Sequence, residues 1–175
     1  GAELRAGGVT RPLLLCTPVL EDELAAVHEH GLTPALSHPA AIDRWCRDAH
    51  RPWQLPIDTG MSRAGVRWDG VRVLAGRVRA CPPEGAFTHF HSADRDPHSV
   101  ARQTQRFREA LDALPSRPAI VHAEKGTAIE HGGASTWTIA RPGIFLYGVA
   151  SGGSIDADPV VHVRARVVGL GSVED

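Results

Sequence analysis

Short apolar runs alternate with longer amphipathic segments along most of this chain. The apolar runs cover residues 13–16, 32–37, 53–57, 85–90, 119–121 and 136–139. The segments between them predict helices over 21–30, 39–50, 71–79 and 99–114, and a short helix from residue 127. Strands that alternate with helices in this way form parallel sheets with right-handed crossovers. The sequence therefore predicts an α/β fold built on a parallel sheet.

The overall composition narrows the range of partners. The chain has 175 residues, 42% of them hydrophobic and 22% charged, which is ordinary content for about one globular domain. A net charge of −1 gives no field that would attract nucleic acid or an anionic membrane. No apolar run approaches the roughly 20 residues that span a bilayer. We therefore expect neither nucleic acid nor a membrane as a partner.

The cysteines and the N-terminal residues bear on localisation. Cys16, Cys46 and Cys81 are odd in number and widely spaced. This pattern favours a reducing compartment and argues against a disulfide framework. The N-terminal residues do not have the pattern of a signal peptide, so a cytoplasmic protein is expected.

Two segments carry the most specific patterns in the sequence. Residues 58–65 are Asp-Thr-Gly-Met-Ser-Arg-Ala-Gly, and residues 141–148 are Arg-Pro-Gly-Ile-Phe-Leu-Tyr-Gly. Ala-Phe-Thr-His-Phe at 86–90, Ala-Asp at 93–94 and His-Ala at 122–123 lie between them. In order and spacing these blocks resemble the bacterial alanine racemases, which are pyridoxal phosphate enzymes, over about residues 9–173.

The resemblance implies an incomplete barrel. The predicted strands match the third to eighth strands of a (β/α)8 TIM-type barrel, so the first two strands are lacking. Residues 1–149 would form this truncated barrel. Residues 150–175 would form a linker and the first strand of a C-terminal β domain that is otherwise missing. Because an opened barrel leaves two sheet edges bare, we expect a homodimer in which two partial barrels or their tails cover one another.

The same resemblance implies a pyridoxal phosphate site. Arg141 matches the arginine that contacts the pyridine nitrogen of the cofactor, and His89 matches a histidine that supports that arginine. Gly143 and Ile144 match backbone donors to the cofactor phosphate. Arg63 matches an arginine beside the phenolic oxygen of the cofactor.

The chain also departs from the family pattern. Lys125 and Gly126 stand where an Asn-Ser pair is usual, which removes a phosphate-binding hydroxyl. Pro56 stands where the family often has a lysine that is carbamylated. The family's Schiff-base lysine and catalytic tyrosine would fall outside these residues. Two-base racemisation then has no acid, base or covalent anchor, so racemase activity is not expected of the chain alone.

A metal site is a second interpretation of the same polar residues. His89 and His91 form an H-x-H pair on a predicted strand, where residues two apart point to one face. His122 ends the neighbouring strand. Three imidazoles with a carboxylate suit zinc or another divalent transition metal. The further candidate ligands lie on strand ends or on the loops that follow, and they are Asp94, His98 and Glu124.

The favoured hypothesis from these residues is a metal-dependent hydrolase of phosphoester bonds, in which metal-activated water is the nucleophile. Arg63 and Arg141 would hold an anionic or phosphoryl-containing small substrate and stabilise negative charge. Asp58 and Lys125 are further catalytic candidates, and Lys125 could form a Schiff base or accept carbamylation. The alternative is a catalytically incomplete alanine racemase fragment with at most residual pyridoxal phosphate binding.

Each candidate also has an interpretation that involves no chemistry. His89 could serve as a hydrogen-bond partner of Arg141 and nothing more. His91 and His98 could be exposed loop residues. Asp58 could brace the turn that follows it.

Overall fold

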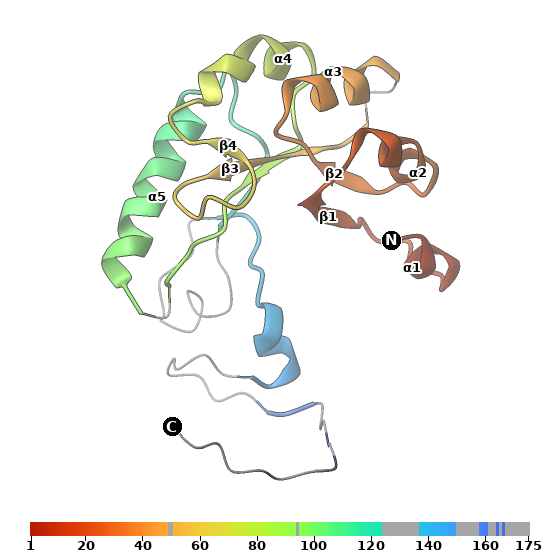
Figure 1. Ribbon diagram of the computed structural model, residues 1–175, viewed down its shortest axis with the longest axis vertical. Coiled ribbons are helices and arrows are strands. Elements are labelled where there is room, and N and C mark those ends of the chain that lie inside the picture. Colours follow the sequence, from red (N-terminus) through yellow and green to blue (C-terminus); the bar gives the residue numbers. More distant parts are fainter. Residues whose placement is uncertain are drawn as a thin grey trace, which may run out of the picture.

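A six-stranded parallel sheet forms the centre of the molecule (Figure 1). The computed structural model describes residues 1–48, 51–93, 95–123, 137–149, 158–160, 164 and 166. The strand order is β1-β2-β3-β5-β6, and β4 pairs with the end of β3. The strands are β1 (Leu14–Pro18), β2 (Thr33–Ala35), β3 (Gln54–Asp58), β4 (Val66–Arg67), β5 (Gly85–Phe87) and β6 (Ile120–His122). The predicted α/β class and the partial parallel barrel are confirmed.

The helices form a layer along one side of this sheet. Figure 1 shows α2 to α5 following one another around its outer side, while the segment that carries η3 lies on the opposite side. The α-helices are α1 (Ala2–Ala6), α2 (Leu24–Glu29), α3 (Pro39–Asp48), α4 (Ala75–Ala80) and α5 (Pro97–Asp112), and the 3-10 helices are η1 (Glu21–Glu23), η2 (Val71–Leu74) and η3 (Gly143–Tyr147). None of the described helices is both long and apolar enough to cross a membrane.

The hydrophobic core lies between the sheet and the helices. Leu55, Ala86 and Val121 are paired in register across β3, β5 and β6, and all three are buried. The helical layer packs onto this row with Ile42, Leu74, Val78, Phe107 and Leu111. Because successive strand residues point to opposite faces, the residues beside this row face away from the helices.

The second face of the sheet carries the row that positions the site. Pro56, Phe87 and His122 are paired in register, one position beyond the core row. All three are buried. Their side chains therefore project from the side of the sheet opposite the helical layer, at the carboxyl ends of the strands.

Most predicted elements are found within a few residues of their expected bounds, and several differences remain. The strand expected over 85–90 ends at Phe87. The described part of the run at 136–139 forms no strand, although the Thr138 amide donates to the Val121 carbonyl at 2.8 Å. Helix α1 and strand β4 were not predicted. The helix from 127, most of the strand expected after 160 and the domain boundary at 149–150 lie wholly or largely outside the described residues and stay predictions.

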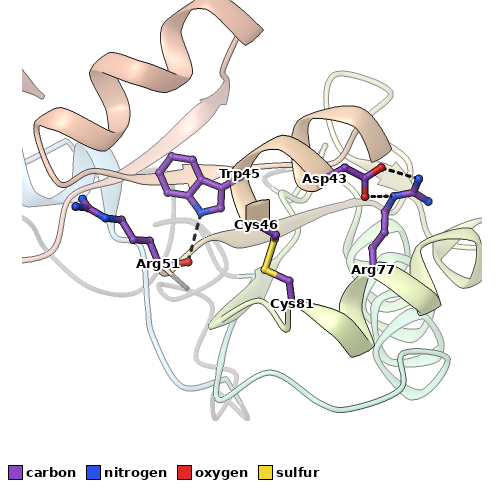
Figure 2. The surroundings of a disulfide bond; sticks show 6 residues. All are labelled: Asp43, Trp45, Cys46, Arg51, Arg77 and Cys81. Carbon is purple, nitrogen blue, oxygen red and sulfur yellow. Dashed lines mark hydrogen bonds and ion pairs between the residues drawn. A yellow bond between two sulfur atoms is a disulfide. The ribbon is translucent and has the colours of Figure 1, made fainter. Parts of the chain in front are cut away.

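A disulfide joins two of the three cysteines, so the prediction against one is wrong. Cys46 of α3 is bonded to Cys81, which directly follows α4, and their Cα atoms are 6.1 Å apart. Arg77 forms a bidentate ion pair with Asp43 at 2.8 Å across the same two helices (Figure 2). The pair was missed because two residues 35 apart in sequence become neighbours only when α3 and α4 pack together. The inference of a reducing compartment from the cysteines loses its support.

Loss of this disulfide should destabilise the fold. Closing a loop between residues 35 apart is worth about 4 kcal/mol of unfolding free energy, or about 12 °C in melting temperature for a domain of this size. We expect the double variant Cys46→Ser with Cys81→Ser, or the reduced wild type, to melt lower by this amount in a calorimetric scan. Cys16→Ser is the control and should melt like the wild type. An oxidised protein whose melting is unchanged by reductant would contradict the prediction.

Candidate functional site

A small hollow lies where β1, β3 and β5 end. Its volume is about 30 Å³, room for about two water molecules. Active sites of parallel α/β barrels gather at this end of the strands. Because the hollow is smaller than a cofactor or substrate, a ligand would lie across its mouth and use its walls as contacts. Those walls are formed by Cys16, Pro56, Ile57, Asp58, Met61, Arg63, Ala64, Phe87, Thr88 and His89.

The turn after β3 places Arg63 at this hollow. The Asp58 carboxylate accepts hydrogen bonds from the Gly60 amide at 2.9 Å and the Ser62 amide at 3.1 Å. Gly65 has φ of 110°, and a Cβ there would lie 2.9 Å from the Pro56 carbonyl oxygen. Any larger residue at Gly65 would therefore push the returning chain away from β3. The structure shows Asp58 bracing the turn, and its catalytic role stays a prediction.

Arg141 is held at the ends of β5 and β6. Its Nη2 donates to the backbone carbonyls of Thr88 and, at 3.0 Å, Ala123. Its guanidinium carbon lies 5.4 Å from the centre of the Phe87 ring. Its Nε is buried and has no hydrogen-bond partner among the described residues. Burial lowers the pKa of Arg141, and the positive charge of nearby Arg63 lowers it further.

His122 lies inside the sheet's second face, away from the hollow. It is 2% exposed, and its Nε2 lies 2.7 Å from Oε1 of Gln54. Its ring stacks on Phe87 with centres 4.9 Å apart and 14° between the planes. Burial, together with the charge of Arg141, lowers the pKa of His122 to about 4. The imidazole is therefore neutral at pH 7.

The histidines proposed as metal ligands do not converge. β5 ends at Phe87, so the H-x-H pair is not on a strand and the alternation argument for it fails. His89 lines the hollow, whereas His91 Nδ1 lies 3.0 Å from the Ser92 hydroxyl. His98 is exposed in the first turn of α5. In the described part of the chain, no group of three His, Cys, Asp or Glu side chains could hold a metal ion.

Three candidate residues lie outside the described residues. They are Asp94 and Glu124, expected as metal ligands, and Lys125, expected as a catalytic group.

Sequence reasoning missed the residues that support the site from behind. The Thr59 and Thr88 hydroxyls are 2.8 Å apart and buried, so they tie the end of β3 to the end of β5. Arg106 of α5 donates to the Thr59 carbonyl at 2.9 Å. Gln54 and Phe87 were passed over as parts of apolar runs. The signal was present, because a glutamine inside a buried strand needs a polar partner on its own face.

The model of the family "Alanine racemase, N-terminal domain" matches residues 1–151.

The chain belongs to this family.

Curated relatives agree with this assignment. The chain is 37% identical over 163 residues to an alanine racemase of Deinococcus radiodurans, and the aligned region covers 90% of the chain and 45% of that protein. It is 33% identical over 197 residues to an alanine racemase of Geobacter sp. (strain M21), and the aligned region covers 99% of the chain and 52% of that relative. The chain thus spans about half the length of these relatives.

Solved structures share the fold. Alanine racemase from E. faecalis superposes with a TM-score of 0.81 at 25% identity, over 90% of the chain and 47% of that structure. A histidine racemase from Leuconostoc mesenteroides superposes with a TM-score of 0.77 at 22% identity, over 90% of the chain and 47% of that structure. Because racemases with two different names share this barrel, the fold does not specify which amino acid is bound.

The hypothesis of a metal-dependent phosphoester hydrolase is therefore wrong. The matching family is that of the alanine racemase N-terminal domain, and the curated relatives and solved structures are racemases, not hydrolases. The proposed zinc site needed His89 and His91 on one strand, but β5 ends at Phe87, before both. It also needed His122, whose Nε2 is hydrogen-bonded to Gln54. The phosphoryl-containing substrate was inferred from Arg63 and Arg141, and neither the family nor the relatives support it.

The neutral state of His122 should make stability depend on pH. The pKa of this imidazole falls from 6.5 to about 4 on folding. Between these values the unfolded chain takes up a proton that the folded protein does not, so stability is lost as pH falls. The loss from this group is at most about 3 kcal/mol. Urea unfolding between pH 7 and pH 4.5 should show a shallower pH slope in His122→Gln and an unchanged slope in the exposed control His98→Gln. A wild-type slope in both variants would refute the assignment.

Proposed function

We propose that this chain is the cofactor-binding barrel portion of a pyridoxal phosphate-dependent alanine racemase. The observation that carries the proposal is the position of Arg141. Its guanidinium is held by two backbone carbonyls at the strand ends and still has a buried, unpaired Nε among the described residues. The family and the curated relatives support the same cofactor and reaction.

The residues present fit this cofactor. Arg141 and Arg63 bring two positive charges to one side of the site, close enough for the charge of Arg63 to lower the pKa of Arg141. Guanidinium groups pair well with the phosphate and phenolic oxygens of such a ligand. Gly143 and Ile144 begin η3 two residues after Arg141, and the first amides of a helix have no partner within it. These amides are the proposed donors to the phosphate.

Pyridoxal phosphate, when bound, supplies an electron sink for removal of the α-proton of an amino acid. Arg141 would donate a hydrogen bond to the pyridine nitrogen. An arginine keeps its proton at neutral pH, so it would leave that nitrogen unprotonated. Arg63 would hold the phenolic oxygen, and His89 lines the same hollow as Arg63. The proposed role of the chain is to bind and orient the cofactor.

Binding of a cofactor analogue tests this role. Pyridoxine 5′-phosphate lacks the aldehyde and cannot react with Lys125 or the N-terminus, so a titration reports the noncovalent site alone. Arg141→Gln should weaken its binding about tenfold or more, since a hydrogen bond to a charged group is worth about 1.5–3 kcal/mol. Arg117→Gln, an exposed change before β6, is the matched control and should bind like the wild type. Equal affinity in all three proteins would count against the proposal.

Alanine as the substrate needs a separate measurement. The probe is phosphopyridoxyl-L-alanine, in which the reduced cofactor is joined to the amino acid, because racemase activity is not expected of this chain. It should bind more tightly than phosphopyridoxyl-L-histidine, which is the matched comparison because a histidine racemase has the same fold. Equal binding of the two adducts, or tighter binding of the histidine adduct, would overturn the choice of alanine.

The homodimer and the cytoplasmic location remain proposals. Ile144, Leu146 and Tyr147 of η3 are exposed apolar side chains that a second copy could cover. Light scattering on the purified chain would decide the first, and cell fractionation the second.

A further inference from the structure

Behind Arg141 lies a column of uncharged side chains on the second face of the sheet. Phe87 contacts the guanidinium, His122 stacks on Phe87, and Gln54 accepts a hydrogen bond from His122. Gln54 lies two residues before Pro56 on β3, so it is on the same face as the row that carries Phe87 and His122. The column therefore runs from the site into the interior of the partial barrel.

A glycine lets Gln54 reach across the sheet. Gln54 and Ile120 flank Gly85 in register, and a Cβ at Gly85 would lie 2.9 Å from Cδ of Gln54. With no side chain on β5 at this position, the amide of Gln54 crosses that strand to His122 on the next one. A side chain on Gly85 would occupy the space that the Gln54 side chain uses to cross β5, so this strand position requires a glycine.

Gln54 determines which nitrogen of His122 carries the proton. Its Nε2 donates toward the Glu84 carboxylate at 3.5 Å, which orients Oε1 toward the imidazole. An amide oxygen only accepts hydrogen bonds, so Nε2 of His122 must be the protonated nitrogen. Nδ1 is then unprotonated, and it is buried with no partner among the described residues. A proton at Nδ1 would leave a buried charge next to Arg141.

A neutral His122 suits the stack in front of it. The ring of Phe87 lies nearly parallel to the imidazole and also contacts the guanidinium of Arg141. A cation is attracted to the face of an aromatic ring, and this attraction holds the guanidinium over Phe87. A second cation in the same column would repel Arg141 across a buried, low-dielectric space.

We propose that Gln54, His122 and Phe87 act as positioning residues for Arg141. Gln54 locks the neutral Nε2–H tautomer and ring plane of His122, His122 supports the face of Phe87, and Phe87 supports the guanidinium that the two carbonyls hold at its edge. The role in cofactor binding rests on the proposed function, but the packing and the tautomer do not.

The tautomer is tested in the unliganded wild type. Nitrogen-15 NMR of histidine-labelled protein at pH 7 should show one buried imidazole that is neutral and protonated on Nε2. His122→Gln assigns the signal. A His122 that is charged at pH 7, or protonated on Nδ1, would overturn the proposal without any further variant.

The support of Arg141 is tested by its own Nε–H signal. This buried group should exchange slowly in the wild type and should be assigned by its loss in Arg141→Gln. Gln54→Leu and Phe87→Leu should both speed its exchange or shift it, whereas Gln105→Leu, an exposed glutamine of α5, should leave it unchanged. An Arg141 signal that is identical in the folded Gln54→Leu and Phe87→Leu proteins would sink the proposal. Should Gln54→Leu not fold, the isosteric Gln54→Glu takes its place, with a charged His122 and a shifted Arg141 signal as its expected result.

The link to the cofactor is measured last. Pyridoxine 5′-phosphate should bind about tenfold more weakly to Gln54→Leu than to wild type or Gln105→Leu, which is the size expected when one buried hydrogen bond is broken. If the wild type does not bind the analogue while both NMR results hold, the proposed function fails and the positioning of Arg141 stands. If the wild type binds and Gln54→Leu binds equally well, the positioning has no bearing on the ligand and the inference fails.

Discussion

Two backbone carbonyls at the ends of β5 and β6 hold one guanidinium, and the candidate site is organised around that contact. Thr88 and Ala123 can both reach Arg141 because their strands are adjacent, parallel and in register, so that their carboxyl ends come to the same edge. The hydrogen bond between the Thr59 and Thr88 hydroxyls extends this alignment to β3. The geometry of the site therefore follows from the register of the sheet and from the buried Thr59–Thr88 contact.

The sequence predicted the elements better than the chemistry. Alternating apolar runs were enough to locate the strands, since a parallel strand buried on both faces needs a continuous apolar stretch. The same pattern misplaced His89 and His91, because residues 85–90 look like one strand while the ordered strand ends at Phe87. His122 was correctly placed at the end of a strand, but its direction depended on Gln54, two strands away. Contacts of that kind follow from register, which no local pattern specifies.

The resemblance to a family and the reading of isolated residue types gave opposite answers, and the difference is physical. A set of histidines and carboxylates is a metal site only when the atoms converge within bonding distance, and sequence supplies the count without the convergence. Ordered motifs carry geometric information, because the residues that fix the turn accompany the residues that do chemistry. Asp58 and Gly65 are of this kind: they shape the segment that presents Arg63.

The Cys46–Cys81 bond has a consequence at the other end of the sheet. With these two cysteines joined, Cys16 is left as the single free thiol of the chain, and it is exposed in the wall of the hollow beside Arg63 and His89. Thiol-reactive reagents modify accessible free cysteines and do not modify cysteines in disulfides. In the oxidised protein, a thiol-reactive spectroscopic label would thus attach at Cys16 alone, at the mouth of the candidate site, without any engineered residue.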